Sequence, residues 1–176
     1  MLQRRTDLAV EARELTRGGA GELQGVKVRE ETREGYPVTR VEVNSQAGAE
    51  ALGKPGGTYV TLDLAALADR EEGAFPRAAR ALAAELGLLL KDVPPTSPAL
   101  VVGLGNRAIT PDAIGPGAAD HTLVTRHLVE LPPEHFGSFR PVAALAAGVL
   151  GTTGVESGEL AGAVAERVRP GGVIAV

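Results

Sequence analysis

The sequence predicts an α/β protein in which helices cover both faces of a mainly parallel sheet, with an additional β region near the N-terminus. Three observations support this fold class. Early segments alternate apolar and polar residues, which is typical of strands with one solvated face. Later segments are apolar throughout, as in the buried strands of parallel sheets. Amphipathic helical patterns separate these later segments, as in α/β folds.

The N-terminal part is expected to contain an arm followed by a small β region. Residues 1–20 are polar and run into a glycine-rich turn, so we expect a leader and flexible arm there. Residues 21–176 are expected to form a single α/β domain. Glycine and proline turns separate three short strand-like segments, which favours an antiparallel or mixed sheet; these segments are Val26–Arg29, Val41–Val43 and Tyr59–Leu62.

A helix is expected over residues 75–91. Leu82, Leu86 and Leu89 recur at positions i, i+4 and i+7, with Glu85 off that stripe, so the leucines are expected to form the buried face. The remaining chain is expected to alternate strands and helices. The expected elements are a strand at Ala99–Val102, a helix at Ala118–Leu131, an apolar strand-like run at Val142–Val149, a helix over residues 158–168 and a strand at Val173–Val176.

Composition argues against several classes of function. Net charge is -4 and the Lys and Arg residues are scattered, which argues against direct binding to nucleic acid. The chain contains no Cys, which excludes disulfides and thiolate chemistry. The histidines lack the spacing of known metal motifs, so no metal or other cofactor is expected. The N-terminus lacks a signal-peptide pattern, and the longest apolar run is too short to span a membrane. We therefore expect a soluble, cytoplasmic protein.

The densest group of special residues is the glycine-rich segment 103–116, directly after a predicted strand. Gly103, Gly105 and Asn106 begin this segment. Glycines there let the backbone approach a ligand closely, and exposed N–H groups can hold an anion or a developing oxyanion. The segment matches neither the dinucleotide-binding fingerprint nor the P-loop. It therefore indicates an active edge without specifying a reaction.

Asp112 is the candidate catalytic residue of that segment. A carboxylate at the edge of a sheet can act as a general base, a nucleophile or a metal ligand. The structural alternative is that Thr110 caps a helix, Pro111 takes its first position and Asp112 faces the helix dipole. Both interpretations stay open on local pattern.

A second loop, residues 148–157, also follows an apolar run and is expected at the same edge. Glu156 and the hydroxyls of Thr152 and Thr153 can line a cleft there. The structural alternative is that Ser157 caps the following helix, with Glu159 in its first turn. We expect Ser157 to be such a cap and leave Glu156 open.

Several segments, in order along nearly the whole chain, together resemble the bacterial spore germination protease family. The matching residues are 5–12, Tyr59–Leu62, Val101–Asn106, Thr110–Ala113, Thr125–Leu128, Phe139–Val142, Gly148, Val149, Gly151, Thr153, Gly154 and Glu156. Two positions depart mildly from the family pattern, with Ala147 in place of Pro and Ser157 in place of Thr.

The resemblance implies an endopeptidase that degrades small acid-soluble proteins in the spore core during germination. It implies a zymogen, cut here between Asp7 and Leu8, that assembles as a homotetramer. Two aspartates are proposed as the catalytic pair of an aspartic-type mechanism. Asp112 matches the first, and the second would directly follow Val176. We therefore expect an N-terminal part of the enzyme, incomplete at its C-terminus and inactive alone.

The first loop also resembles that of the hydrogenase-maturation peptidases, in which a metal-binding carboxylate takes the position of Asp112. This likeness implies a three-layer α/β/α fold with the same active edge, and it keeps a metallopeptidase as an alternative. A truncated protein without catalytic activity is the other alternative. Activity against a small acid-soluble protein and the metal content of the purified protein distinguish the three.

Overall fold

The computed structural model describes residue 9 and residues 24–130 and 139–176, and the chain divides into two compact units. The first unit spans residues 1–89 and the second residues 90–176, and each is described by itself. The leader predicted over residues 1–20 lies outside the described residues, apart from Ala9. The single domain over residues 21–176 stays a prediction.

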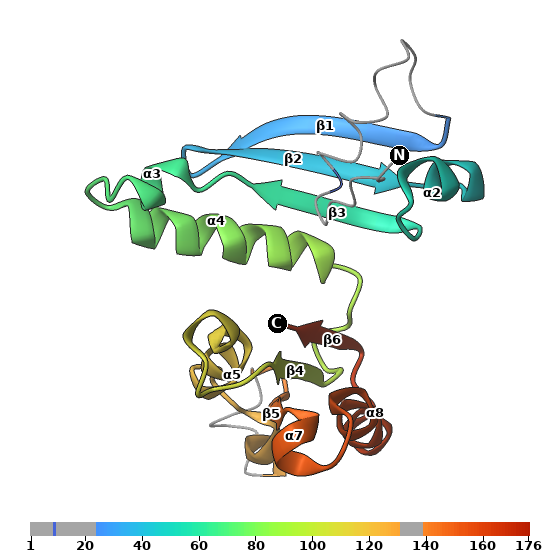
Figure 1. Ribbon diagram of the computed structural model, residues 1–176, viewed down its shortest axis with the longest axis vertical. Coiled ribbons are helices and arrows are strands. Elements are labelled where there is room, and N and C mark those ends of the chain that lie inside the picture. Colours follow the sequence, from blue (N-terminus) through green and yellow to red (C-terminus); the bar gives the residue numbers. More distant parts are fainter. Residues whose placement is uncertain (1–8, 10–23, 131–138) are drawn as a thin grey trace. The chain divides into compact units, whose positions relative to one another are not determined.

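The first unit contains an antiparallel sheet with strand order β1-β2-β3 (Figure 1). Its strands are β1 (Val26–Arg33), β2 (Tyr36–Val43) and β3 (Gly57–Leu62). The structure confirms the three predicted strands and their antiparallel pairing. Each strand extends beyond the segment predicted from alternation.

The central strand β2 contributes to two small cores because different side chains face each side of the sheet. Val41 and Val43 pack with Leu52 and with Ala9. Tyr36 lies in the other core with alanines of helix α4. Both faces of β2 are therefore partly covered, although the alternation predicted one solvated face, whereas β1 remains largely exposed.

Helix α4 (Ala74–Leu89) confirms the predicted helix, but the buried face was predicted wrongly. Leu82 and Leu89 are 53% and 47% exposed. The buried positions are Ala74, Ala78, Ala81 and Glu85. Small alanine side chains let the helix approach the sheet closely, and the Tyr36 hydroxyl donates to the Ala74 carbonyl over 2.7 Å. Contacts with the sheet therefore determine which face of α4 is buried, and the spacing of the leucines does not.

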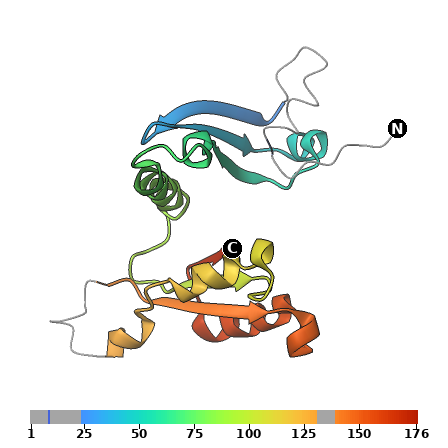
Figure 2. The ribbon, with the colours of Figure 1, turned by 60° about the vertical axis from the view of Figure 1, so that its left-hand side comes forward.

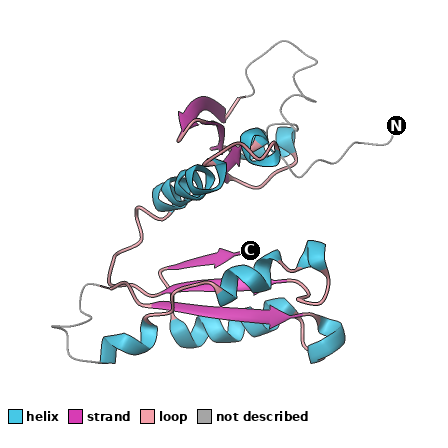
Figure 3. Cartoon of the chain, turned by 90° about the vertical axis from the view of Figure 1, so that its left-hand side faces the viewer, coloured by secondary structure: helices cyan, strands magenta, loops and turns pink. Residues whose placement is uncertain are grey.

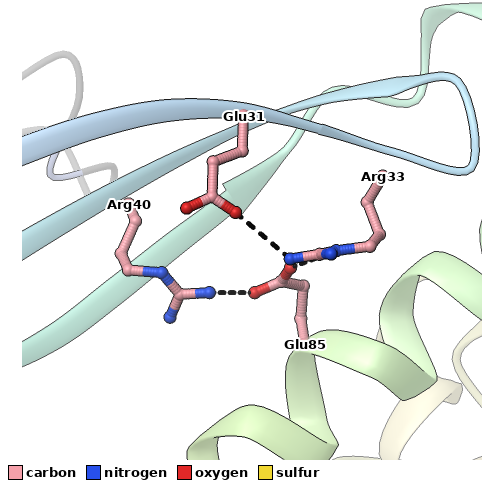
Figure 4. A network of polar contacts seen from close by, with 4 residues as sticks. All are labelled: Glu31, Arg33, Arg40 and Glu85. Atoms are coloured by element: carbon pink, nitrogen blue, oxygen red, sulfur yellow. Dashed lines mark hydrogen bonds and ion pairs between the residues drawn. The ribbon is translucent and has the colours of Figure 1, made fainter.

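Glu85 projects from α4 into a cluster of charged side chains on the sheet (Figure 4). The Arg33 Nε donates to Glu85 Oε1 over 3.1 Å, and Arg40 pairs with the other carboxylate oxygen. Arg33 also pairs with Glu31 at 3.1 Å. The Glu85 side chain is only 4% exposed, so water solvates its charge poorly. The two arginines compensate the charge instead.

Two short helices in the first unit were not predicted. Helix α2 (Gln46–Leu52) begins at Ser45, whose hydroxyl accepts the Gly48 N–H over 3.0 Å, and ends at a left-handed Gly53. Helix α3 (Ala65–Ala68) has a single turn. Both are too short for hydrophobic periodicity to be read from sequence.

The second unit contains a parallel sheet with strand order β5-β4-β6 (Figure 2). Its strands are β4 (Ala99–Leu104), β5 (Val142–Gly148) and β6 (Gly172–Ala175). The parallel sheet predicted from apolar strands is confirmed. The two sheets have different strand directions, so the fold is mixed α/β.

Helices flank both faces of the central strand β4 (Figure 3). Leu100 and Val102 are buried against helix α8 (Ser157–Val168). Gly103 points to the other face, toward helix α5 (Ile114–Asp120). Both faces of the strand are therefore removed from water, which explains its unbroken apolar sequence.

The helix predicted over Ala118–Leu131 is wrong. Helix α5 ends at Asp120, and a separate 3-10 helix, η2, covers Arg126–Glu130. The buried Thr125 between them bonds to the chain before β5: its hydroxyl donates to the Arg140 carbonyl and its N–H donates to the Val142 carbonyl over 3.0 Å. A residue bonded in this way to another segment is not available to a helix interior. The apolar Leu123 is 74% exposed.

The longest helix of the described ranges is α4, with 16 residues. None of the helices in these ranges combines the length and apolarity needed to cross a membrane.

Candidate active site

The candidate site lies at the carboxyl end of β4, where the glycine-rich loop begins. The Leu104 N–H at the end of β4 donates to the Val176 carbonyl over 2.8 Å, so the ends of β4 and β6 adjoin. The chain then forms a 3-10 turn, η1 (Thr110–Asp112), before helix α5 returns along the sheet. This is the edge at which open parallel sheets place their functional groups.

Close backbone contacts hold α5 against the sheet. A Cβ at Gly115 would lie 2.1 Å from the Leu104 carbonyl oxygen and 2.3 Å from that of Val176. A Cβ at Gly103 would lie 2.2 Å from the Gly115 carbonyl oxygen. Gly105 has φ +115, a conformation that favours glycine, and its Cβ would lie 2.2 Å from the Asp112 carbonyl oxygen. Side chains are excluded at all three positions.

The Asp112 carboxylate closes the loop onto its own beginning. Its Oδ2 accepts the Asn106 backbone N–H over 2.7 Å, and the Asp112 N–H donates to the Ile109 carbonyl over 2.8 Å. Thr110 lies inside the 3-10 turn, and its side chain makes no capping bond. The capping geometry considered from sequence is therefore absent here, and Asp112 instead braces the loop while its side chain stays exposed.

A pocket of about 290 Å³ opens beside this loop. Of the predicted loop residues, Gly105 and Asn106 line it, whereas Gly103 packs under α5. The opposite side comes from the end of β5 and the turn after it. The other lining residues are Arg107, Ala108, Pro116, Ala146, Gly148, Val149 and Thr152.

The second predicted loop contains a helical turn, α7 (Leu150–Thr153), and its polar side chains are used locally. The Thr153 hydroxyl donates to the Val149 and Val155 carbonyls at 3.1 and 2.9 Å. Glu156 is the N-cap of α8 and forms a capping box with Glu159, whose carboxylate accepts the Glu156 N–H at 3.2 Å. The predicted Ser157 cap is wrong, because that hydroxyl donates to the Gly148 carbonyl.

Arg107 forms a two-point ion pair with Asp120 at the end of α5. Its Nη2 donates to Asp120 Oδ1 over 3.0 Å, and Nη1 bonds to the other oxygen. This hydrogen bonding lowers the pKa of the Asp120 carboxyl, desolvation opposes the shift, and charge attraction from Arg107 adds to it. The same pairing raises the pKa of Arg107. Both groups are exposed, so solvent weakens the attraction.

Most of the pocket lining lies in the two segments that the sequence singled out, residues 103–116 and 148–157, which were expected at one edge of the sheet, whereas Ala146 was missed. Thr152 and Ala146 belong to β5 and its following turn, and β5 pairs directly with β4. The signal in the sequence that could have identified Ala146 is the apolar run of β5, which suits a strand paired with β4. Arg107 sits next to Asn106, within the segment already singled out. Asp7 and Leu8, the predicted leader cleavage site, lie outside the described residues.

Metal binding was also considered for this edge. Over residues 24–130 and 139–176, no three His, Asp or Glu side chains are grouped closely enough to hold a metal ion. His121 is placed by a contact of its Nδ1 with the Gly117 carbonyl at 2.8 Å.

Comparison with known proteins connects this geometry to a family. The family model described as germination protease matches residues 4–176. Germination protease from Caldanaerobacter subterraneus subsp. tengcongensis is 46% identical over 176 residues, which cover 98% of this chain and 52% of that protein. The proteins of the same name from Priestia megaterium and Clostridium perfringens (strain ATCC 13124) are 40% and 42% identical, over 98% of this chain and 49% and 54% of their lengths. The chain thus spans about half the length of these relatives.

Proposed function

Because the chain belongs to the germination protease family, we propose that it is the N-terminal part of an endopeptidase whose active site lies at the carboxyl edge of the β5-β4-β6 sheet. The observation that carries this proposal is the position of Asp112. Its carboxylate is held at the edge where two strands end, and it bonds to Asn106, which lines an open pocket, although Asp112 itself does not line it. Peptide hydrolysis by an activated water requires a group that accepts the water proton and a cleft that holds the peptide next to it.

The proposed substrates are small acid-soluble spore proteins, degraded in the spore core during germination. This assignment is supported by the family and by the match of residues 4–176 to its model. The resemblance also supports a zymogen cut between Asp7 and Leu8 and a homotetramer. The flanking of β4 by α5 and α8 supports a three-layer α/β/α arrangement like that of the hydrogenase-maturation peptidases.

The proposed mechanism uses Asp112 as one member of a carboxylate pair. One Asp112 oxygen accepts the Asn106 N–H, and the remaining lone pairs of the carboxylate are available to a water molecule. The second carboxylate is proposed to follow Val176, whose carbonyl adjoins Leu104 and Gly115 at the same edge. Two carboxylates close together share one proton, which suits general acid–base hydrolysis. We propose that residues 1–176 alone do not cleave substrate.

The test is made with the full-length protein, a purified small acid-soluble spore protein and the variant Asp112→Asn. An Asn oxygen still accepts the Asn106 N–H, so the loop keeps its brace while the ionisable group is lost. Cleavage is expected to fall at least about 100-fold, as for loss of a general base. The melting temperature is expected to stay close to that of the parent protein.

A matched control is Asp92→Asn, which makes the same change before the start of β4 and far along the sequence from the site. It is expected to cleave normally. The isolated 176-residue chain is expected to be inactive. Full activity of Asp112→Asn would assign Asp112 a purely structural role, and absence of cleavage by the full-length parent would overturn the proposed function itself.

A further inference from the structure

The side chain of Asn106 is oriented by its own loop. Its Oδ1 accepts the Ala108 N–H over 2.9 Å, and its backbone N–H donates to Asp112. An amide oxygen must face an N–H donor, so this bond fixes which end of the side chain is oxygen and which is nitrogen. The two Nδ2 hydrogens therefore project from the other end of the amide.

Within residues 24–130 and 139–176, those hydrogens have no protein acceptor. In the described part of the chain, no hydrogen bond is made by Asn106 Nδ2, although the residue is half-buried and lines the pocket. The other polar side chains of the pocket are engaged. Both terminal nitrogens of Arg107 bond to Asp120, and the Thr152 hydroxyl donates to the Val149 carbonyl over 3.0 Å. The Asn106 amide is thus an oriented, uncharged donor that can still bond to an oxygen acceptor.

We propose that the Asn106 amide is a further catalytic group, which donates a hydrogen bond to the carbonyl oxygen of the peptide bond under attack. This inference rests on the proposed peptidase function. Asn106 and Asp112 are joined through the Asn106 backbone, so the donor and the proton acceptor keep a fixed spacing. A donor that is already oriented stabilises developing negative charge without reorganisation during the reaction.

The step balances as follows. Asp112 is the ionised member of the proposed pair, and the shared proton stays on the other carboxyl. The water oxygen bonds to the carbonyl carbon, one water proton passes to the carboxylate of Asp112, and the π electron pair of the carbonyl moves to its oxygen. Asn106 Nδ2 then donates to an oxyanion, a stronger acceptor than the ground-state carbonyl. When the C=O bond reforms, the C–N bond breaks and the proton leaves Asp112 for the amine nitrogen. The donor stabilises the intermediate more than the bound substrate, so it acts on kcat.

The discriminating variant is Asn106→Asp in the full-length protein, assayed on a purified small acid-soluble spore protein over a range of concentrations. An Asp oxygen still accepts the Ala108 N–H, so the turn is preserved, but the donor is replaced by a negatively charged oxygen. We expect kcat to fall about 100-fold or more, as for removal of an oxyanion donor. KM is expected to change less than about threefold, and the melting temperature is expected to be unchanged.

Two further variants complete the experiment. Asn106→Ala removes donor and acceptor together and is expected to lower both kcat and thermal stability. Asn44→Asp makes the same change of charge in the other unit and is expected to leave kcat unchanged. The inference is overturned if Asn106→Asp keeps kcat within about threefold, or if kcat and melting temperature fall together, which is the behaviour of a loop brace. Inactivity of the parent protein would instead refute the proposed peptidase.

Discussion

At the scale of single residues, Glu85 illustrates how one charged side chain fixes the orientation of a helix. It is 3% exposed, and its carboxylate is neutralised by arginines from β1 and β2. A buried charge without partners is costly, so the helix is held with this residue toward the sheet. Leucine spacing predicts the neighbouring face of the helix because it counts apolar area and takes no account of the arginines on the strands.

Replacing Glu85 by Gln is expected to destabilise the first unit by about 3 kcal/mol. The change keeps the size of the side chain but leaves Arg33 and Arg40 facing a neutral group. This loss of stability is at the low end of the range for breaking a buried ion pair, because the Arg33 side chain is 33% exposed. Urea unfolding followed by circular dichroism measures it.

The matched control is Arg80→Gln on the same helix, which removes the ion pair with Glu34. Those side chains are 59% and 38% exposed, so the cost is expected to stay below about 1 kcal/mol. Equal costs for the two variants would show that burial of Glu85 does not strengthen its pairing.

The Arg107–Asp120 pair predicts that the stability of the folded protein depends on pH in the acid range. Hydrogen bonding to Arg107 lowers the pKa of Asp120 in the folded protein, so the carboxyl stays ionised to lower pH than in the unfolded chain. The resulting stability is present above the unfolded pKa of about 4 and is lost as the pH falls through the lowered folded value. The stability difference between the parent protein and Asp120→Asn is therefore expected to be constant at neutral pH and to shrink below about pH 4.

Thermal unfolding of both proteins between pH 2 and 7 measures this difference. A difference that persists unchanged into strong acid would show that Asp120 acts through packing rather than through its charge.

At the scale of elements, the sequence predicts strands better than it predicts helices. Strand β4 is recognisable because both of its faces are covered, and an unbroken apolar run is the direct result. The helix predicted over Ala118–Leu131 failed because Thr125 bonds to a segment that lies more than a dozen residues further along the chain. Local periodicity carries no information about such a partner.

The residues that line the pocket also differ in how well the local sequence predicts them. Gly105 and Asn106 were found because a glycine-rich turn directly after an apolar strand is a local pattern. Thr152 was expected at the same edge because its loop also follows an apolar run, whereas Ala146 was missed because it reaches the pocket only through the pairing of β5 with β4. The near wall of the pocket is thus a property of one segment, whereas the far wall is a property of strand order.

Helix α5 offers a matched pair of glycines that tests its contact with the sheet. Gly115→Ala places a methyl group about 2 Å from two carbonyl oxygens, those of Leu104 and Val176. The helix has to move, so we expect a loss of at least about 2 kcal/mol in stability. Gly117→Ala meets nothing within 4 Å and is expected to add about 0.5–1 kcal/mol, because alanine favours the helix.

Chemical denaturation of the two variants gives the comparison. In the full-length protein, Gly115→Ala is also expected to lower cleavage, since α5 follows Asp112 directly. Equal free energies of unfolding for Gly115→Ala and Gly117→Ala would show that α5 does not contact the carbonyl groups at the strand ends.

At the scale of the whole molecule, each unit has its own hydrophobic core. Leu100 and Val102 belong to the core of the second unit, whereas Ala9 packs with Val41, Val43 and Leu52 in the first. Ala9 lies two residues beyond Asp7. The cut proposed between Asp7 and Leu8 would therefore leave this contact with the product.

Maturation of the full-length protein is accordingly expected to produce Leu8 as the new N-terminus without loss of the first core. Intact-mass measurement and N-terminal sequencing identify the cut, and the unfolding transition of the product is expected to match that of the precursor. A different N-terminus would refute the proposed position. A lower transition would show that residues 1–7 support the core.

The close backbone contacts at Gly103, Gly105 and Gly115 also limit how the pocket can be redesigned. No larger residue fits at these positions without moving α5 or the η1 turn, so the backbone on this side of the pocket has a fixed path. The opposite wall is formed by side chains, including those of Ala146, Val149 and Thr152. Libraries meant to alter the shape of the pocket should therefore keep these three glycines and randomise the side of β5 and its following turn.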